Sequence, residues 1–247
     1  MQRHIFRFYS TDLARSGCVA QNRKTKDPSV CLKKIMMTSR NVLKSDYKQH
    51  GGTCLLASYA FLLEYAGIFQ SGGPIRTVYD VFAAYLRFHN TLEPIVCLTA
   101  EQIKGQGREA EKLIGKAINA YCHTHGHVAG YQQIKKFHEW LSSQGLISNI
   151  EISRIMPPIG KPRSMPIADA YQTISSFLMK KDAQGFWGAL ILYLAGKGAH
   201  TVFLGYDGDF FIRDSNYSRE TGNMASFNFT FNANSPITEY MLCRIHK

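Results

Sequence analysis

A cysteine that follows two glycines and begins an apolar run is the feature of this sequence best suited to covalent chemistry. Cys54 comes directly after His50-Gly51-Gly52-Thr53 and opens CLLASYAFLLEYAG, a stretch typical of a buried helix. A helix N-terminus presents unpaired backbone N–H groups and the positive end of the helix dipole, and both favour a thiolate. Because the thiolate is the nucleophilic form, this position predicts a nucleophile at Cys54. The alternative is a small apolar core residue.

A base for this thiol is predicted from a hairpin more than a hundred residues later. His200 begins one apolar run, Asp214 ends the next, and Asp207-Gly208 between them is a hairpin turn signal. The rise per strand residue is constant, so the 14 positions from 200 to 214 bring the chain back beside its start. We therefore expect a Cys–His–Asp triad in which His200 is the base and Asp214 orients it.

Two amide side chains extend this candidate site. Gln49 lies five residues before Cys54, where its side-chain N–H could join the backbone N–H of Cys54 as an oxyanion donor. Asn216 lies two residues after Asp214, on the same strand face, and is the alternative partner for His200. Asp214 is preferred because a carboxylate stabilises an imidazolium better than an amide does.

The segment CHTHGH is the one candidate for a metal site. It contains Cys122, His123, His125 and His127. Zinc sites usually combine two ligand pairs, the second far away in the sequence, and no such second pair accompanies this segment. A helix end, where histidines suit the negative end of the dipole, is the favoured interpretation. We expect no metal and no cofactor.

Apolar periodicity predicts helices in the first two thirds of the chain and strands in the last third. Helices are expected over 54–67, 71–90, 100–122, 130–146 and 167–182, and strands over 147–155, 188–196, 199–207, 209–216, 225–232 and 237–246. The helix over 100–122 is expected to be interrupted by Gly105, Gly107 and Gly115. This order is an α+β pattern. Residues 1–45 are predicted to be a flexible basic leader and residues 46–247 one catalytic domain, in which the helical region 68–187 has no assigned role.

Composition describes an ordinary globular chain with a strong positive charge. Its 247 residues are 45% hydrophobic and carry a formal net charge of +11. No run of eighteen apolar residues predicts a membrane-spanning helix. The basic residues are scattered and lack any RNA-binding signature, so attraction to an acidic partner or an anionic membrane surface is favoured over nucleic-acid binding. The six cysteines are dispersed without a CxxC pair, which favours reduced thiols.

Two segments resemble the papain-like cysteine peptidases. SDYKQHGGTCLLASYAFLLEYAG resembles their cysteine-bearing helix, and GAHTVFLGYDGDFFIRDSNYSRETG resembles their histidine block and the Asp-x-Asn that follows it. The bacteriocin-processing, double-glycine-type and YopT-type branches are the nearest, although Ser215 replaces their usual proline and Gln49 is one position nearer the cysteine than is commonest. The resemblance covers about 45 residues. It implies a papain-like fold, in which a helical part bearing Cys54 packs on a C-terminal antiparallel sheet bearing His200 and Asp214.

The resemblance also implies a function. It indicates a cysteine protease, a thiol hydrolase that forms an acyl-thioester on Cys54 of the enzyme. Glutamine deamidation, acyl transfer and a catalytically inactive binding module are the alternatives. A basic chain with a polar leader and no Sec-type apolar core resembles a bacterial effector, a virulence factor or toxin secreted by a non-Sec route into a target cell, with the cytoplasm as the alternative location. The expected partner is a protein of a host or competitor cell.

Overall fold

The computed structural model shows an α+β fold. It describes residues 39–40, 42–124, 130–156, 167–195, 198–217, 220–222 and 236–247. The chain divides into two units, Met1–Ile35 and Met36–Lys247, and all described residues belong to the second. Its elements in chain order are β1 (Ser39–Arg40), α2 (Cys54–Tyr65), the 3-10 helix η1 (Ile68–Gln70), α3 (Val78–Asn90), α4 (Ala100–Gln106), α5 (Arg108–Thr124), α6 (Tyr131–Ser143), β2 (Ile150–Met156), α7 (Ile167–Leu178), β3 (Gly185–Ala195), β4 (Gly198–Tyr206), β5 (Phe210–Arg213), β6 (Glu220–Gly222) and β7 (Ile237–His246).

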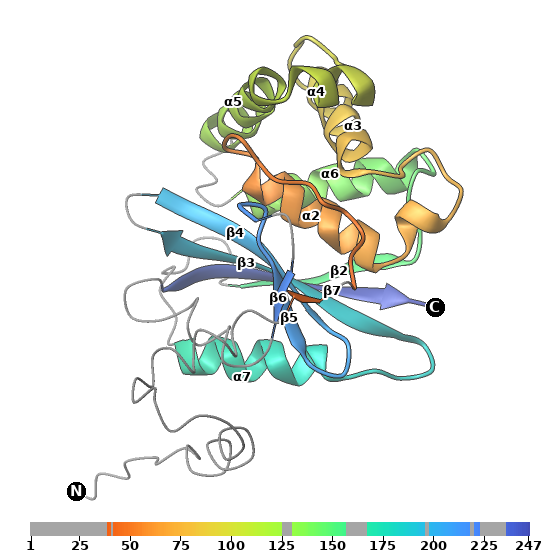
Figure 1. Ribbon diagram of the computed structural model, residues 1–247, viewed down its shortest axis with the longest axis vertical. Coiled ribbons are helices and arrows are strands. Elements are labelled where there is room, and N and C mark those ends of the chain that lie inside the picture. The colour runs from red at the N-terminus through yellow and green to blue at the C-terminus, as the bar shows by residue number, and fades with distance from the viewer. Residues whose placement is uncertain are drawn as a thin grey trace, which may run out of the picture. The chain divides into compact units, whose positions relative to one another are not determined.

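A seven-stranded antiparallel sheet organises this unit. Its strands lie in the order β1-β6-β5-β4-β3-β7-β2, so the chain's last strand is inserted between β3 and β2. Helices α2 to α6 lie on one side of the sheet and α7 lies on the other (Figure 1). Two separate apolar clusters fill the spaces between these layers. The sheet alternates its side chains between the two clusters, as strand geometry requires.

Helix α2 is the central helix of the larger cluster. Every residue from Leu55 to Glu64 is buried, which explains why the sequence from Cys54 onward is apolar on all sides. Its contacts with the sheet are mainly with β4, the strand that carries His200. The helix ends at Tyr65, and Gly67 then adopts a left-handed φ of 82°. Helix α2, which begins with Cys54, therefore packs against the strand that carries His200.

Most predicted elements are confirmed, with shifted boundaries. The predicted helix over 71–90 begins only at Val78, because Thr77 and Asp80 form a capping box there. The predicted helix over 100–122 is two helices, separated at Gly107, whose positive φ of 47° breaks the hydrogen-bond ladder. The predicted strand over 225–232 lies outside the described residues. The very short β1 and β6 were not predicted.

The predicted leader overlaps the folded unit at its end. Leu43 is buried, and the N–H groups of Lys44 and Ser45 donate to Glu64 Oε1 of α2 at 2.6 and 2.9 Å. Residues 42–45 are therefore packed against α2 rather than part of a flexible segment. Residues 1–38 lie outside the described residues, so flexibility there stays a prediction.

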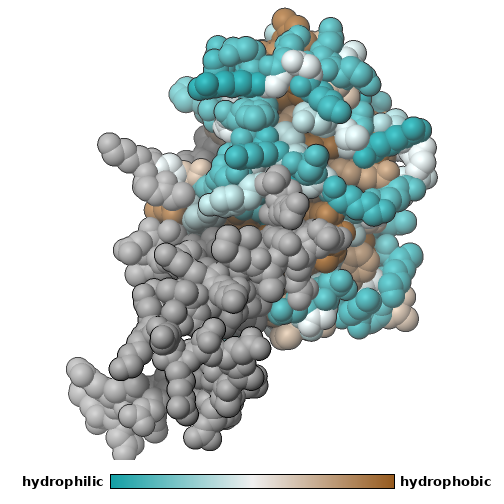
Figure 2. Space-filling model, in the orientation of Figure 1, coloured by the Kyte–Doolittle hydropathy of each residue, from teal (hydrophilic) through white to brown (hydrophobic). Residues whose placement is uncertain are grey.

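The surface of the described residues is mainly polar. Figure 2 shows hydrophilic residues over most of the helical layer, with smaller hydrophobic areas between them. The large apolar side chains that are exposed are Leu92, Val96, Met179, Leu194 and Tyr217. No helix in the described part of the chain is long and apolar enough to cross a bilayer.

Candidate active site

The start of α2 and the start of β4 bring Cys54 and His200 together. Cys54 is the first residue of α2 and is half-buried, whereas His200 is only 7% exposed. One turn into the helix, the Ser58 hydroxyl donates to the backbone oxygen of Thr201 at 3.0 Å. This bond ties α2 to β4 at the residue next to His200, so the two reactive side chains are held by adjoining backbone.

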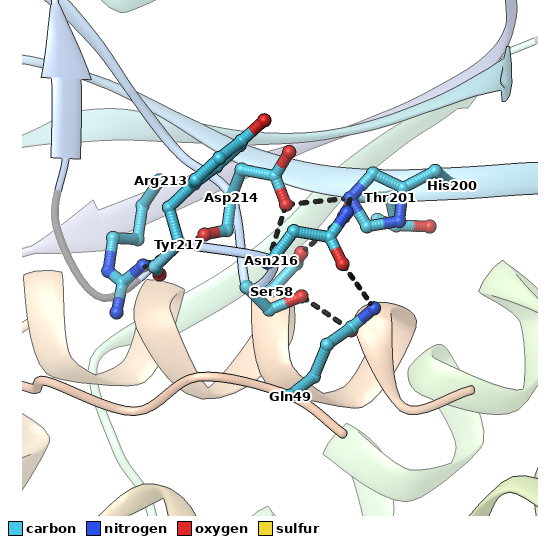
Figure 3. A network of polar contacts seen from close by, with 9 residues as sticks. Gln49, Ser58, His200, Thr201, Arg213, Asp214, Asn216 and Tyr217 are labelled. Atoms are coloured by element: carbon cyan, nitrogen blue, oxygen red, sulfur yellow. Dashed lines mark hydrogen bonds and ion pairs between the residues drawn. The ribbon is translucent and has the colours of Figure 1, made fainter. Parts of the chain in front are cut away.

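The β4–β5 hairpin brings Asp214 to His200, as its length predicts. Nε2 of His200 lies 2.7 Å from Asp214 Oδ1 (Figure 3). The antiparallel register pairs Phe203 with Arg213, so its extension places His200 opposite residue 216 and diagonal to Asp214. Because Nε2 is engaged by the carboxylate, Nδ1 is the ring nitrogen left for Cys54.

Asn216 contributes to the same corner. Its backbone N–H donates to Asp214 Oδ1 at 2.8 Å, and its side-chain Nδ2 lies 3.2 Å from His200 Nε2. Both candidate partners of the histidine therefore contact it. The carboxylate of Asp214 is closer to the ring, and the backbone N–H of Asn216 helps to hold that carboxylate in place.

The electrostatics of the pair favour a thiolate and an imidazolium. Burial disfavours a charged Cys54, but the hydrogen bond and positive charge of His200, with the backbone N–H groups of Thr201 and Leu55, lower the pKa of the thiol. Burial also disfavours a charged His200, yet the hydrogen bonds to Asp214 and Cys54 raise its pKa to about 9. Both shifts favour transfer of the shared proton from the thiol to the imidazole.

Gln49 links the two halves of the site. Its backbone N–H donates to the Ser215 oxygen at 2.7 Å, and its side-chain oxygen accepts from the Ser215 hydroxyl at 2.7 Å. Its Nε2 donates to Asn216 Oδ1 at 2.8 Å, which uses one of the two N–H groups of the amide (Figure 3). The predicted oxyanion donor thus lies at the site, and the hydrogen bonds seen here join the segment before Cys54 to the segment after Asp214.

Three further residues support the site and were not predicted. The ring of Tyr193 packs edge-on against His200 with centroids 5.6 Å apart. Arg213 is fully buried and donates to carbonyl oxygens on both sides of the site, and Glu111 is a buried carboxylate on α5. A charged residue within an apolar strand or on the apolar face of a helix is the sequence signal that could have found the last two.

Half of the candidate metal segment lies outside the described residues. Cys122 and His123 belong to the last turn of α5, as expected for a helix end, while His125 and His127 are not described. Within the described ranges, no group of three or more His, Cys, Asp or Glu side chains is arranged to hold a metal ion.

Known proteins offer little to compare with this chain. No protein-family model and no curated protein matches it. The crystal structure of Pseudomonas avirulence protein AvrPphB is similar over 87% of this chain and 98% of that chain, with 14% sequence identity and a TM-score of 0.40. A likeness of this degree supports no conclusion about the activity of this chain.

The close approach of α5 to the loop before Cys54 allows a prediction about stability. A Cβ at Gly115 would lie 3.5 Å from the Gly52 oxygen, which is an ordinary contact. Glycine inside a helix costs about 0.5–1 kcal/mol relative to alanine, so Gly115→Ala is expected to raise the free energy of unfolding by about that amount. Urea denaturation measures it.

A second glycine provides the matched control. At Gly130, φ is +77° and an added Cβ would lie 2.5 Å from Leu55 Cδ2, so Gly130→Ala should destabilise the protein in the same assay. A loss of stability in Gly115→Ala would show that α5 and the loop are packed more tightly than these distances indicate.

Proposed function

We propose that this chain is a papain-like cysteine peptidase in which Cys54 is the nucleophile, His200 the base and Asp214 the group that orients the histidine. The observation that carries this proposal is the joint geometry of the three residues. The Asp214 carboxylate is 2.7 Å from one nitrogen of His200, and Cys54 lies at a helix start within hydrogen-bonding reach of the imidazole. This is the nucleophile–base–orienter arrangement that thiol hydrolases require.

Each residue then has a defined step. The Cys54 thiolate attacks a substrate carbonyl, and the backbone N–H of Cys54, with Gln49 as a second donor, stabilises the resulting oxyanion. Protonated His200 gives its proton to the leaving amine as the C–N bond breaks, which leaves an acyl-thioester on Cys54. His200 then takes a proton from water, which attacks the thioester and releases the acid. Asp214 keeps the imidazole oriented and stabilises its charge throughout.

The biological setting proposed here is an effector or toxin that acts on a protein of another cell. It is supported by the resemblance of the Cys54 and His200 segments to the YopT-type branch of the papain-like peptidases. The formal net charge of +11 also suits an acidic partner or an anionic surface. The residues that would select the substrate remain unassigned.

Comparing wild type with Cys54→Ala in a lysate of candidate target cells tests the proposed reaction. Mass spectrometry should find new peptide termini with wild type and none with the variant, because removal of the sulfur prevents formation of the acyl-thioester. Glutamine-to-glutamate conversion without new termini would replace the peptidase by a deamidase on the same triad. Identical peptide maps for both proteins would refute the enzyme and leave a binding protein.

A further inference from the structure

Glu111 of α5 is the hydrogen-bonding centre of the loop that leads to Cys54. Its carboxylate is 2% exposed, and it accepts four hydrogen bonds from residues 47–53, which we call the nucleophile loop. The donors are the Tyr47 hydroxyl at 2.8 Å, the backbone N–H groups of His50 and Gly51 at 2.7 and 2.9 Å, and the Thr53 hydroxyl at 3.3 Å. A carboxylate with this many donors is a strong local restraint.

The first residues of the nucleophile loop are also tied to the segment around Asp214. Arg213 donates to the Tyr47 oxygen, and Gln49 bonds to Ser215. The outer face of the loop borders an open cleft of about 1090 Å³, lined in part by Tyr47, Lys48 and His50. Two successive glycines, Gly51 and Gly52, give the backbone a wide choice of conformations. The backbone bonds from His50 and Gly51 to Glu111 therefore hold the part of the loop between Gln49 and the start of α2.

These bonds determine which backbone N–H groups remain for a substrate. The N–H groups of His50 and Gly51 both point to Glu111 Oε2. Within the described part of the chain, the N–H of Cys54 has no acceptor. An oxyanion formed at the Cys54 sulfur would need that N–H, and a rotation of the loop would turn it away.

We infer that Glu111 is a positioning residue for the oxyanion-binding backbone of Cys54. This inference rests on the proposed function. All four partners are neutral donors, so the proposed role needs acceptor oxygens at the right reach; the negative charge strengthens each bond but is not needed to orient the loop. Glu111→Gln keeps this reach. The oxygen of the glutamine can accept from the two backbone N–H groups, and its NH2 group can donate to the Tyr47 hydroxyl. That hydroxyl then donates its own proton to Thr53 Oγ1, which lies 3.1 Å away. Glu111→Asp keeps the charge and withdraws it by one methylene.

Two reagents separate positioning of the oxyanion from reactivity of the thiol. Iodoacetamide alkylates the Cys54 sulfur and releases iodide, with no oxyanion in the reaction. p-Nitrophenyl acetate transfers its acetyl group to the sulfur through a tetrahedral oxyanion and releases p-nitrophenolate. Rates at Cys54 are measured on the full chain by peptide mass mapping and by the p-nitrophenolate burst, with thermal unfolding as the check that each variant is folded.

Glu111→Ala and Glu111→Asp are expected to lower the acetylation rate about tenfold or more while alkylation stays within about threefold, and Glu111→Gln should restore acetylation. If Glu111→Ala does not fold, the Asp and Gln pair decides.

Wild-type acetylation in Glu111→Asp together with a loss in Glu111→Gln would assign the effect to charge and overturn the inference. Equal losses with both reagents, or no loss in any variant, would also overturn it. A wild-type Cys54 no more reactive than N-acetylcysteine at pH 6 would refute the proposed function, and the inference with it.

Discussion

Iodoacetamide is expected to modify Cys54 almost as fast at pH 6 as at pH 8. An ordinary thiol with a pKa of about 8.5 loses roughly 80-fold of its thiolate over this range, and its alkylation rate falls in proportion. Burial opposes ionisation of Cys54, but His200 and two backbone N–H groups more than compensate and lower the pKa of the thiol. The partner imidazole keeps its proton up to its own pKa of about 9. We therefore expect the thiolate–imidazolium pair to persist across the neutral range.

Other cysteines of the same chain serve as internal references. Burial raises the pKa of Cys122 and of Cys243, so both should react slowly at pH 6. Cys97 is exposed and is mapped separately as a distinct peptide. N-acetylcysteine in the same solution reports the slope of an ordinary thiol.

Removal of the imidazole tests the physical cause of this behaviour. His200→Ala takes away the hydrogen bond and the positive charge, and leaves burial as the dominant influence on Cys54. We expect the rate at pH 6 to fall on the order of 100-fold and the ordinary steep dependence on pH to return. A flat profile that survives in His200→Ala would mean that the helix start and its N–H groups alone hold the thiolate, and His200 would lose its assigned role.

The proximity of the three candidate side chains was predictable because each position depends on local chain geometry. Cys54 stands where glycines meet an apolar helix, and the length of the β4–β5 hairpin determines which residues meet His200. The choice between Asp214 and Asn216 was harder, since both lie on one strand face and both contact the ring. The sequence indicates that Asp214 and Asn216 lie on the strand face toward His200. The distances from His200 Nε2, 2.7 Å to the Asp214 carboxylate and 3.2 Å to the Asn216 amide, depend on the exact bend after β5.

Supporting residues could not be predicted in the same way. A charged residue in an apolar pattern marks Glu111 and Arg213 as unusual, but their partners include backbone groups of segments distant in sequence, which carry no sequence signature. The same reason explains the missed strands. β1 and β6 are two and three residues long, too short for an alternating pattern, and pair through backbone bonds. An interruption of the helix over 100–122 was expected at Gly105, Gly107 or Gly115, but a glycine within a helical pattern is often tolerated, and the sequence does not tell which of the three ends the helix.

Arg213→Met is expected to be the most destabilising substitution near the site. The guanidinium is fully buried and lies 4.3 Å over the Phe61 ring. After β5 it donates to the carbonyl oxygens of Asp214, at 2.8 Å, and Tyr217. Before α2 it donates to those of Ser45, at 3.2 Å, and Tyr47, at 2.7 Å. Methionine fills much of the volume but leaves these carbonyls without a donor. Charged hydrogen bonds and unsatisfied buried groups of this kind cost about 1.5–3 kcal/mol each, and the losses are not additive, so we expect a total of about 3–5 kcal/mol.

Arg76→Met is the matched control, because Arg76 is exposed and its side chain makes one hydrogen bond, to the Gly73 oxygen at 3.0 Å. Its free energy of unfolding in urea should change by less than about 0.5 kcal/mol. Arg213→Lys keeps the charge, but a single ammonium lacks the planar fork that reaches carbonyls of both segments, so it should fall between the two. Equal stability of Arg213→Met and wild type would show that the two segments are held by other contacts. The expected loss would mean instead that the buried Arg213 joins the backbone before Cys54 to the backbone after Asp214. The alignment of Cys54 with His200 would then depend on a residue that has no step in the proposed reaction.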